Sequence, residues 1–503
     1  MSQDLVYSID LGTMGVKLCL VSFDGTIKAS AASEYPIISN SPGEAEQDPL
    51  DWWKGIVSCS KRLAEESSDL LSNVRAVSIC GQMHTHVYLD RDRELLGNAI
   101  TWMDQRSTKL LQEWETKGVS AQIFDSTWNA PSTTYTVPQV CWMKKHKPEL
   151  VKNTHFILLA KDYLKFLMTG KMVTDPSDAS GVGTFDIRTN EWSSEAFHAA
   201  GIEKSLFPPV HPSTSVIGKL TPMASQELCL KEGIPVLNGG SDHSVAEIGS
   251  GMLSEDTLSC IVGTAGVVAA CVSKPIKDEE KRIMCWSYPI DGFWDLLGIT
   301  QTAASCLTWF RDTFDPDQKK GIFEEYSRMA DKAKPGSEGL VFLPYLIGER
   351  TPLWDSHAKG VFFGIQLKHR KEHFIRSIME GVAYSLKDCM DVMSQLSGAS
   401  FDTVSLTGGG SKSRVWREIQ SDVFGVKTRT LQTSDTGAIG NLILALIGLG
   451  EIEGPADAAH LIRPEETQDP CLETSRVYQD AHRLYHDIYN NTRNLMRETE
   501  ELS

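Results

Sequence analysis

The chain is poor in positive charge relative to negative charge. It has 49 Lys and Arg residues against 66 Asp and Glu residues, so its net charge is −17. Surfaces that bind nucleic acids or anionic membranes need a basic footprint, and we therefore expect neither kind of partner. The sequence also lacks an apolar run long enough to span a bilayer. Because 41% of the residues are hydrophobic and no low-complexity run is present, the composition is that of an ordinary globular protein.

Closely spaced cysteines are missing as well. The eleven cysteines are scattered, and no two are closer than Cys260 and Cys271, so there is no C-x-x-C zinc or redox pair. Cysteines spread among apolar neighbours are typical of reduced packing residues. The first residues, MSQDLVYSID, do not have the basic region and apolar core of a secretory signal. These features together predict a cytoplasmic location.

Apolar strand patterns alternate with amphipathic helix patterns along the whole chain. A length of 503 residues exceeds one ordinary core, so we expect two or more domains. The alternation predicts an α/β fold, and a polar turn near residues 250–257 suggests domains at 1–252 and 253–503. Asp48 and Pro49 predict the start of a helix, and Gly425 predicts the end of another. Strands are predicted at residues 5–10, 16–23, 74–80, 234–240, 258–264, 266–273 and 401–409, and a buried helix at 436–450.

One fifteen-residue phrase occurs twice. SIDLGTMGVKLCLVS at residues 8–22 and SCIVGTAGVVAACVS at residues 259–273 share seven residues at a constant offset of 251 positions. Each copy predicts a strand, a glycine turn and a second strand. The repeat indicates a duplicated fold, and a cleft between two matching halves is a natural place for a ligand.

The glycine turns of both copies suit a phosphate chain. Glycines let backbone N–H groups approach phosphate oxygens, and Thr13 and Thr264 add hydroxyl donors beside Gly12 and Gly263. Asp10 occurs only in the first copy and is the kind of carboxylate that binds hydrated Mg²⁺. Taken alone, the first phrase is more typical of an ordinary hairpin with an aspartate, and the second copy is what favours a phosphate site.

A third glycine turn lies in LTGGGSKSRVW, where Gly408, Gly409 and Gly410 lead from a strand into a helix. Amides at a helix N-terminus favour phosphate or nucleotide. The turn is not a Walker A loop, because Ser411 precedes Lys412 where that motif needs glycine, and it does not match the dinucleotide fingerprint. A tight structural turn remains an alternative.

Asp242 follows a predicted strand in LNGGSDHSVAEIGSG, just before a helix. A carboxylate at this position suits a general base that accepts a proton from an alcohol. The alternative is a helix N-cap, a position that aspartate fills very often.

Two further phrases combine polar and aromatic groups. GQMHTHVYLD contains Gln82, Met83, His84 and His86, which suit a pocket that binds hydroxyl groups better than a zinc site, because no third ligand is evident.

In AITWMDQRS, an aromatic ring and an acid suit a sugar platform. The same acid, Asp104, is equally suited to a structural ion pair with Arg106, while Trp102 supplies the aromatic face.

These phrases, taken in order, resemble those of the FGGY carbohydrate kinases, and within that family the xylulose kinases most of all. The resemblance extends to about residue 450 and is also found in AKDYLKFLMTGKMVTDPSDASGVGTFDIRTNEW, FLPYLIGERTPLWDSHAKGVFFGI and LTGGGSKSRVWREIQSDVFG. It implies two duplicated actin-like (ribonuclease-H-like) domains with the active site in the interdomain cleft. It also implies transfer of a phosphoryl group from ATP, with Mg²⁺, to a small sugar, and it is compatible with a homodimer.

The resemblance implies roles for individual residues. Asp242 would be the catalytic base and Asp10 would organise Mg²⁺. The nucleotide and its phosphates would lie near Thr13, Gly263, Thr264, Gly408, Gly409, Gly410 and Lys412. The sugar would lie near Gln82, Met83, His84, Trp102, Asp104, Asp242 and His243.

Several positions depart from the family pattern. Thr85 and His86 follow the GQMH phrase, His243 follows the proposed base where Asn or Gln is usual, and the loop at 129–139 differs. Because these positions were expected near the sugar, the acceptor stays open between D-xylulose and another ketose or polyol. The acid usual before the late Gly437–Ala438 pair is also missing. An actin-like ATPase without sugar chemistry is the alternative from a different class.

Overall fold

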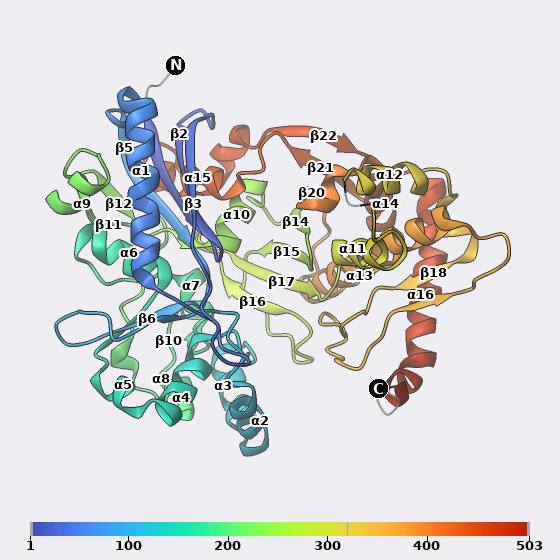
Figure 1. The fold of residues 1–503 in the computed structure, drawn as a ribbon, viewed down its shortest axis with the longest axis horizontal. Coiled ribbons are helices and arrows are strands. Elements are labelled where there is room, and N and C mark those ends of the chain that lie inside the picture. The colour runs from blue at the N-terminus through green and yellow to red at the C-terminus, as the bar shows by residue number, and fades with distance from the viewer. Residues whose placement is uncertain (1–3, 319, 500–503) are drawn as a thin grey trace.

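The computed structural model describes residues 4–318 and 320–499, which form two lobes built on two seven-stranded sheets. Figure 1 shows the blue-to-green N-terminal half beside the yellow-to-red C-terminal half. All eleven cysteines are unpaired, and all except Cys229 and Cys471 are buried, as the scattered spacing predicted. Within the described residues, no helix is both long and apolar enough to cross a membrane.

The first sheet is centred on the strand that precedes the first glycine turn. Its strands β1, β5 and β12 are parallel, and β2, β3 and β11 run antiparallel to their neighbours. Short strand β13 (Gly240–Ser241) extends the pairing along β5. The order across the sheet is β11 (Val216–Lys219), β12 (Pro235–Leu237), β5 (Val74–Gly81), β1 (Leu5–Leu11), β2 (Gly15–Ser22) and β3 (Ile27–Glu34).

The second sheet repeats this pairing scheme. Strands β14, β20 and β21 are parallel, and β15, β17 and β22 are antiparallel to their neighbours. The duplicated phrase therefore forms equivalent hairpins in the two sheets, which confirms the predicted duplication. The order is β16 (Met284–Ser287), β17 (Trp294–Thr300), β15 (Gly266–Val272), β14 (Thr257–Val262), β20 (Thr403–Thr407), β21 (Lys427–Leu431) and β22 (Pro464–Gln468).

Two helices, α10 (Asp242–Ser250) and α15 (Thr436–Leu449), lie between the sheets and pack against one another. A Cβ at Gly249 would overlap the carbonyl oxygen of Thr436, and a Cβ at Gly440 would overlap that of Val245. Only glycine allows backbones to approach this closely. The lobes therefore meet through two tightly packed helices.

Helix α15 belongs to the second half of the sequence but covers the first sheet. Its buried Asn441 donates from Nδ2 to Ser8 Oγ and to the carbonyl oxygen of Ile9, both at 3.1 Å, and accepts from Ser78 Oγ at 3.1 Å. The predicted buried helix is confirmed. The boundary proposed at residues 250–257 falls in the turn between α10 and β14.

Longer helices cover the outer faces. Asp48 caps α1 (Pro49–Leu71) by accepting from the N–H of Leu50 at 2.9 Å, and Gly425 ends α14 (Arg414–Phe424) in the left-handed region, as the sequence predicted. Helix α13 (Lys371–Ser397) is largely buried. The last helix is α16 (Leu472–Glu498), and residues 500–503 lie outside the described part of the chain.

A smaller layer beside the first sheet carries the GQMH and TWMDQR phrases. Its four strands are β4 (Glu46–Gln47), β7 (Ala99–Ile100), β6 (His86–Leu89) and β8 (Phe156–Leu159), in that order. Its apolar core includes residues of the surrounding helices α2 (Thr108–Lys117), α3 (Val119–Thr127), α4 (Thr136–His146) and α8 (Ser194–Ala200).

Candidate active site between the two lobes

A cavity of about 1010 Å³ lies between the lobes and is lined from both halves of the chain. The second half contributes Val267, Ile299, Arg350 and Trp354, among others. The residues predicted from sequence that line this cavity are Thr13, Met83, His84, Trp102, Asp242 and His243.

A second cavity, of about 550 Å³, lies in the C-terminal lobe beside the third glycine turn. Gly409, Gly410 and Lys412 line it together with apolar side chains that include Leu307 and Trp416. A Cβ at Gly408, whose φ is 82°, would lie 2.7 Å from the carbonyl oxygen of Val262. The turn therefore packs directly on the last residue of β14, next to the second hairpin turn, and needs glycine there.

The second hairpin turn contacts this smaller cavity through its neighbour Ala304. The carbonyl oxygen of Gly263 accepts from the N–H of Ala304 at 2.8 Å, and that of Thr264 accepts from Ser305 Oγ at 2.7 Å. Ala304 itself lines the cavity, whereas Gly263 and Thr264 do not.

Hydrogen bonds fix the first hairpin turn in place. Tyr35 donates its hydroxyl to the carbonyl oxygen of Gly12, and Gln47 Nε2 donates to that of Thr13 at 2.6 Å. Trp102 Nε1 donates to Thr13 Oγ1 at 2.8 Å, so the predicted aromatic platform touches the predicted phosphate loop. The residue expected near the sugar, Trp102, and the residue expected near the phosphates, Thr13, thus form one surface.

The Asp10 carboxylate has little compensation for its charge. It accepts a weak bond from Cys80 Sγ at 3.5 Å, and burial raises its pKa. A Cβ at Gly437 would lie 2.8 Å from Asp10 Oδ2, so glycine leaves room beside this oxygen. The neighbouring Asp435 forms an ion pair with Lys17 and adds negative charge near Asp10. An acidic position with room beside the carboxylate oxygen fits a hydrated Mg²⁺ ion.

Asp242 is the first residue of α10, and its carboxylate does not cap the helix. Ser241 is the N-cap and accepts from the N–H of Ser244 at 3.3 Å, so the N-cap interpretation of Asp242 is wrong. Asp242 Oδ1 accepts from the N–H of His243 at 2.8 Å. Burial, and next the charge of Asp10, raise the pKa of Asp242 to about 7. A carboxylate with this pKa exchanges protons readily near neutral pH.

An acidic cluster that the sequence analysis did not identify lies behind the proposed base. His243 Nε2 is 2.5 Å from Glu247 Oε1, one helical turn along α10. Asp295, on β17 of the other lobe, accepts from Ser244 Oγ at 3.3 Å, and burial raises the pKa of Glu247 to about 8. The four-residue spacing of His243 and Glu247 was the available signal for one pair, but no local pattern pointed to Asp295.

His84 has the geometry of a hydrogen-bond acceptor. Its backbone is left-handed, with φ of 66°, and its ring stacks on Tyr135 at 5.1 Å between centroids. Nδ1 lies 2.8 Å from the carbonyl oxygen of Gly181 and must donate to it. Because burial lowers the pKa of His84 to about 4, the ring is neutral at pH 7 and its Nε2 can accept a hydroxyl proton.

Gln82 and Asp104, predicted to bind substrate, do not line the cavity. Gln82 is buried, where it donates to Gln47 Oε1 at 2.9 Å and accepts from Thr85 Oγ1 at 3.1 Å. Asp104 accepts from Arg106 Nε at 2.8 Å, which is the structural ion pair that the sequence left open. Both side chains therefore support the cavity wall rather than face it.

His86 is a satisfied core histidine. Its Nδ1 lies 3.1 Å from the carbonyl oxygen of His84, and its Nε2 lies 2.9 Å from the hydroxyl of Tyr88. In the part of the chain that the structure describes, neither His84 nor His86 belongs to a group of three metal-binding side chains.

A fully buried charge network lies beside the segment that carries the proposed base. Lys161, on α6 (Ala160–Thr169), lies within 2.8 Å of carboxylates of Asp162, Asp175 and Asp178. Ser177, on α7 (Pro176–Ser180), donates to Asp175 at 2.5 Å and accepts from the N–H of Ser241 at 3.0 Å. The network thus reaches the residue that precedes the proposed base.

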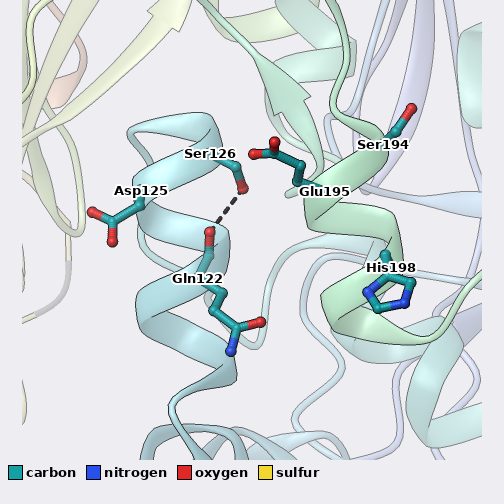
Figure 2. Close-up of a pocket in the computed structure, with 6 residues that line it drawn as sticks. All are labelled: Gln122, Asp125, Ser126, Ser194, Glu195 and His198. Atoms are coloured by element: carbon teal, nitrogen blue, oxygen red, sulfur yellow. Dashed lines mark hydrogen bonds between the residues drawn. The ribbon is translucent and has the colours of Figure 1, made fainter.

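A further cavity, of about 540 Å³, lies between α3 and α8 (Figure 2). Its lining is polar and mostly exposed, and its one buried member, Ser126, donates to the carbonyl oxygen of Gln122 at 2.8 Å. None of the residues predicted from sequence lies there. We therefore assign the candidate active site to the cavity between the lobes.

Comparison with known proteins agrees with this geometry. Residues 5–249 match the N-terminal domain of the FGGY family of carbohydrate kinases, and residues 258–449 match its C-terminal domain. A xylulose kinase of Bacillus subtilis (strain 168) is 34% identical over 491 residues, which cover 97% of each chain.

Solved structures agree with the family match. A ligand-bound xylulose kinase from Lactobacillus acidophilus superposes with a TM-score of 0.91 at 27% identity, over 97% of this chain and 98% of that one. A gluconate kinase from the same organism also has a TM-score of 0.91, at 28% identity over 97% of this chain and 99% of that one. The duplicated sheets, the cleft between them and both family matches lead to one conclusion: this chain belongs to the FGGY family of carbohydrate kinases.

Proposed function

We propose that this kinase transfers the γ-phosphoryl group of ATP to a hydroxyl of D-xylulose and forms D-xylulose 5-phosphate. The observation that carries the proposal is Asp242, a carboxylate with a pKa of about 7 in the wall of the interlobe cavity. In the proposed reaction Asp242 accepts the hydroxyl proton while the oxygen attacks the γ-phosphorus. Relatives named xylulose kinase, including the one from Bacillus subtilis, support the choice of sugar.

The nucleotide would span the two cavities. The apolar slot beside Gly409, Gly410 and Lys412 fits the adenosine end, and the first hairpin turn at Thr13 fits the phosphates. Asp10 would hold Mg²⁺, and the ion supplies charge neutralisation for the phosphate oxygens. Phosphoryl transfer depends mainly on such positioning and charge stabilisation, so this donor set suits the reaction.

The sugar side combines an aromatic wall with acceptors. Trp102 offers a ring face, and neutral His84 offers an acceptor nitrogen in the same cavity lining. Among the positions that differ from the usual family pattern, Thr85 and His86 are buried in the wall. His243 and the loop from Ala130 to Tyr135 line the cavity. Because these lining positions differ from the usual pattern, another ketose or a polyol is the second candidate acceptor.

The acceptor is tested by measuring ADP release from ATP with a panel of ketopentoses, ketohexoses, gluconate and glycerol. We expect one ketopentose, D-xylulose, to stimulate ADP release far above the rate without sugar. Stimulation by a different panel member alone would move the assignment to that acceptor. Equal ADP release with and without every sugar would contradict a kinase and favour the actin-like ATPase.

The pH dependence of the reaction follows from the raised pKa of Asp242. The base works only when ionised, so kcat/KM for the sugar should be constant above about pH 7 and fall about tenfold per pH unit below it. The charge of His243 lowers the pKa of Asp242, and we therefore expect His243→Asn to move this acid limb to higher pH. The measurement is an initial-rate profile at saturating MgATP. A wild-type profile that stays flat well below pH 7 would contradict Asp242 as the titrating base.

The predicted cytoplasmic location and homodimer stay predictions. The same holds for the domain limits of 1–252 and 253–503, which the family matches at 5–249 and 258–449 support.

A further inference from the structure

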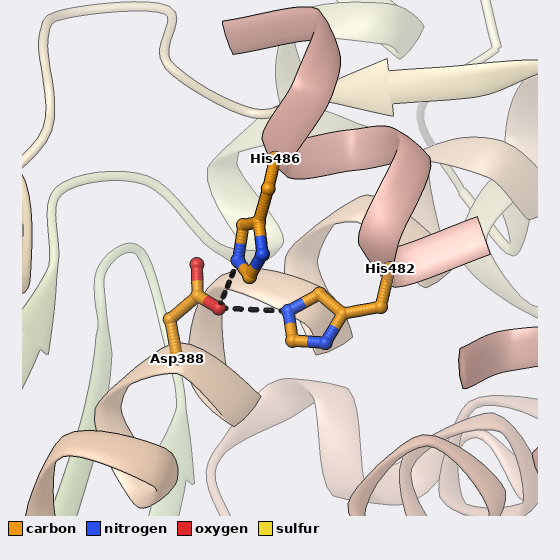
Figure 3. A group of neighbouring side chains, drawn as sticks. All are labelled: Asp388, His482 and His486. Carbon is orange, nitrogen blue, oxygen red and sulfur yellow. Dashed lines mark hydrogen bonds and ion pairs between the residues drawn. The ribbon is translucent and has the colours of Figure 1, made fainter. Parts of the chain in front are cut away.

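Two histidines of the C-terminal helix converge on one aspartate of α13, and the proposed reaction uses none of these three residues. His482 and His486 lie four residues apart on α16, and each Nε2 is 2.7 Å from the same oxygen, Asp388 Oδ1. Figure 3 shows both imidazole rings directed from α16 toward this carboxylate. Their centroids are 4.4 Å apart.

This arrangement places one acid against two imidazoles. One carboxylate faces two imidazoles, and two imidazolium charges at this separation would repel each other. The Asp388 side chain is only 7% exposed, so the contact of this carboxylate with both imidazoles is largely shielded from solvent. Two neutral imidazoles and one carboxylate are instead the ligand types of a divalent transition metal.

The donor atoms are also close enough for one ion. All three lie within 4.8 Å of one another. Zinc sits about 2.0–2.2 Å from histidine nitrogen and carboxylate oxygen, so tetrahedral donors are somewhat more than 3 Å apart. The Nε2 to Oδ1 distances of 2.7 Å therefore need to open by about 0.6–0.9 Å. Histidines four residues apart on a helix already face the same way.

We propose that Asp388, His482 and His486 form a zinc-class divalent metal site that joins α16 to α13. Three protein ligands leave a fourth position for a solvent molecule. A cavity of about 250 Å³ adjoins the cluster, and its lining includes Asp388 and His486 together with Gln395 and Asn490. The 48% exposed His486 side chain gives the ion a route from solvent.

The position of the site links it to the interlobe cavity. On the same helix, Tyr485 accepts from the hydroxyl of Tyr345 at 2.5 Å, and Tyr489 donates to Asp355 Oδ2 at 2.8 Å. The segment between Tyr345 and Asp355 carries Arg350 and Trp354 into the interlobe cavity. A metal ion at this site would therefore fix the helix that holds a wall of the active site.

The site is tested on chelator-treated, nucleotide-free, full-length protein by calorimetric titration with Zn²⁺ and by absorption spectra with Co²⁺ as the probe. We expect wild type to bind one Zn²⁺ at the site, to give the strong visible bands of tetrahedral Co²⁺, and to show a higher Tm with Zn²⁺. His482→Ala and His486→Ala should each weaken this binding at least 100-fold and remove the Co²⁺ bands. His460→Ala, which changes an exposed histidine bonded to a backbone carbonyl, is the matched control and should bind as wild type does.

A second cluster of potential ligands, His243, Glu247 and Asp295, makes one further control necessary. Glu247→Gln should leave the Co²⁺ bands and the Zn²⁺-dependent gain in Tm intact. If the bands survive in His482→Ala but disappear in Glu247→Gln, the metal binds at the other cluster and the proposal is wrong. Absence of stoichiometric Zn²⁺ binding by wild type would also overturn it.

Discussion

The Asp242→Asn variant is expected to lose about 10²- to 10⁴-fold in kcat for sugar phosphorylation while its KM for ATP changes little. Asparagine keeps the shape of the side chain and its bond from the N–H of His243, but it cannot accept the hydroxyl proton. The measurement is sugar-dependent ADP release at saturating substrates. Asp402→Asn, an exposed aspartate in the loop before β20, is the matched control and should retain full activity.

The same variant should be more stable than the wild type at neutral pH. The folded-state pKa of Asp242 is about 7, well above its ordinary value of 3.8, so folding favours the protonated carboxyl. This contribution is fully present below about pH 4 and is lost as the pH rises through 7. Asparagine removes the cost of the buried charge, and we expect a Tm several degrees higher at pH 8.

For the activity prediction, an Asp242→Asn variant that keeps more than half of the wild-type kcat would exclude Asp242 as the base.

The Lys161→Met variant should lose about 3–5 kcal/mol of folding free energy, the cost typical of removing one partner from a buried ion pair. Its ammonium is fully buried and lies within 2.8 Å of three carboxylates, from Asp162, Asp175 and Asp178. Lys165 pairs with Asp162 at 2.9 Å, whereas Asp175 and Asp178 would each lose the ammonium that lies 2.7 Å away. Because Ser177 connects Asp175 to the backbone of Ser241, activity should fall together with stability.

Urea unfolding of the wild type and of Lys161→Met measures this loss. Lys152→Met is the control, because Lys152 is 75% exposed and its partner Glu149 lies 3.8 Å away, so its change should be under about 0.5 kcal/mol. Adding Asp178→Asn to the Lys161→Met variant should restore part of the stability by removing one uncompensated acid. A loss below about 1 kcal/mol for Lys161→Met would show that the network is not a structural element.

Local sequence patterns predicted the parts of the fold that local chemistry determines. The duplicated hairpins, the cap at Asp48 and the glycine that ends α14 all follow from residues within a few positions of one another. The sequence pattern of α15 does not show which sheet the helix covers, because an apolar helix fits either one. Its placement depends on Gly249 and Gly440, which are almost 200 positions apart and allow the helices to touch.

The candidate site also contains some residues that local patterns pointed to and others that they could not identify. Thr13, Trp102 and Asp242 come from three separate phrases and line one cavity, and their roles there stay predictions. Gln82 and Asp104 have the residue types expected of sugar ligands, but neighbours distant in sequence, Gln47 and Ala45, take up their polar atoms. Asp295 and the cluster of Asp388 with the α16 histidines depend on contacts between separate elements, so no local pattern could identify them.

The central claim is that this chain phosphorylates a sugar rather than merely hydrolysing ATP. The most direct measurement is ³¹P NMR of the protein with MgATP and D-xylulose, followed over time. The account predicts that a phosphomonoester signal coupled to the sugar C5 protons grows as ADP forms, with little inorganic phosphate. ADP accompanied only by inorganic phosphate, at a rate independent of the sugar, would contradict it.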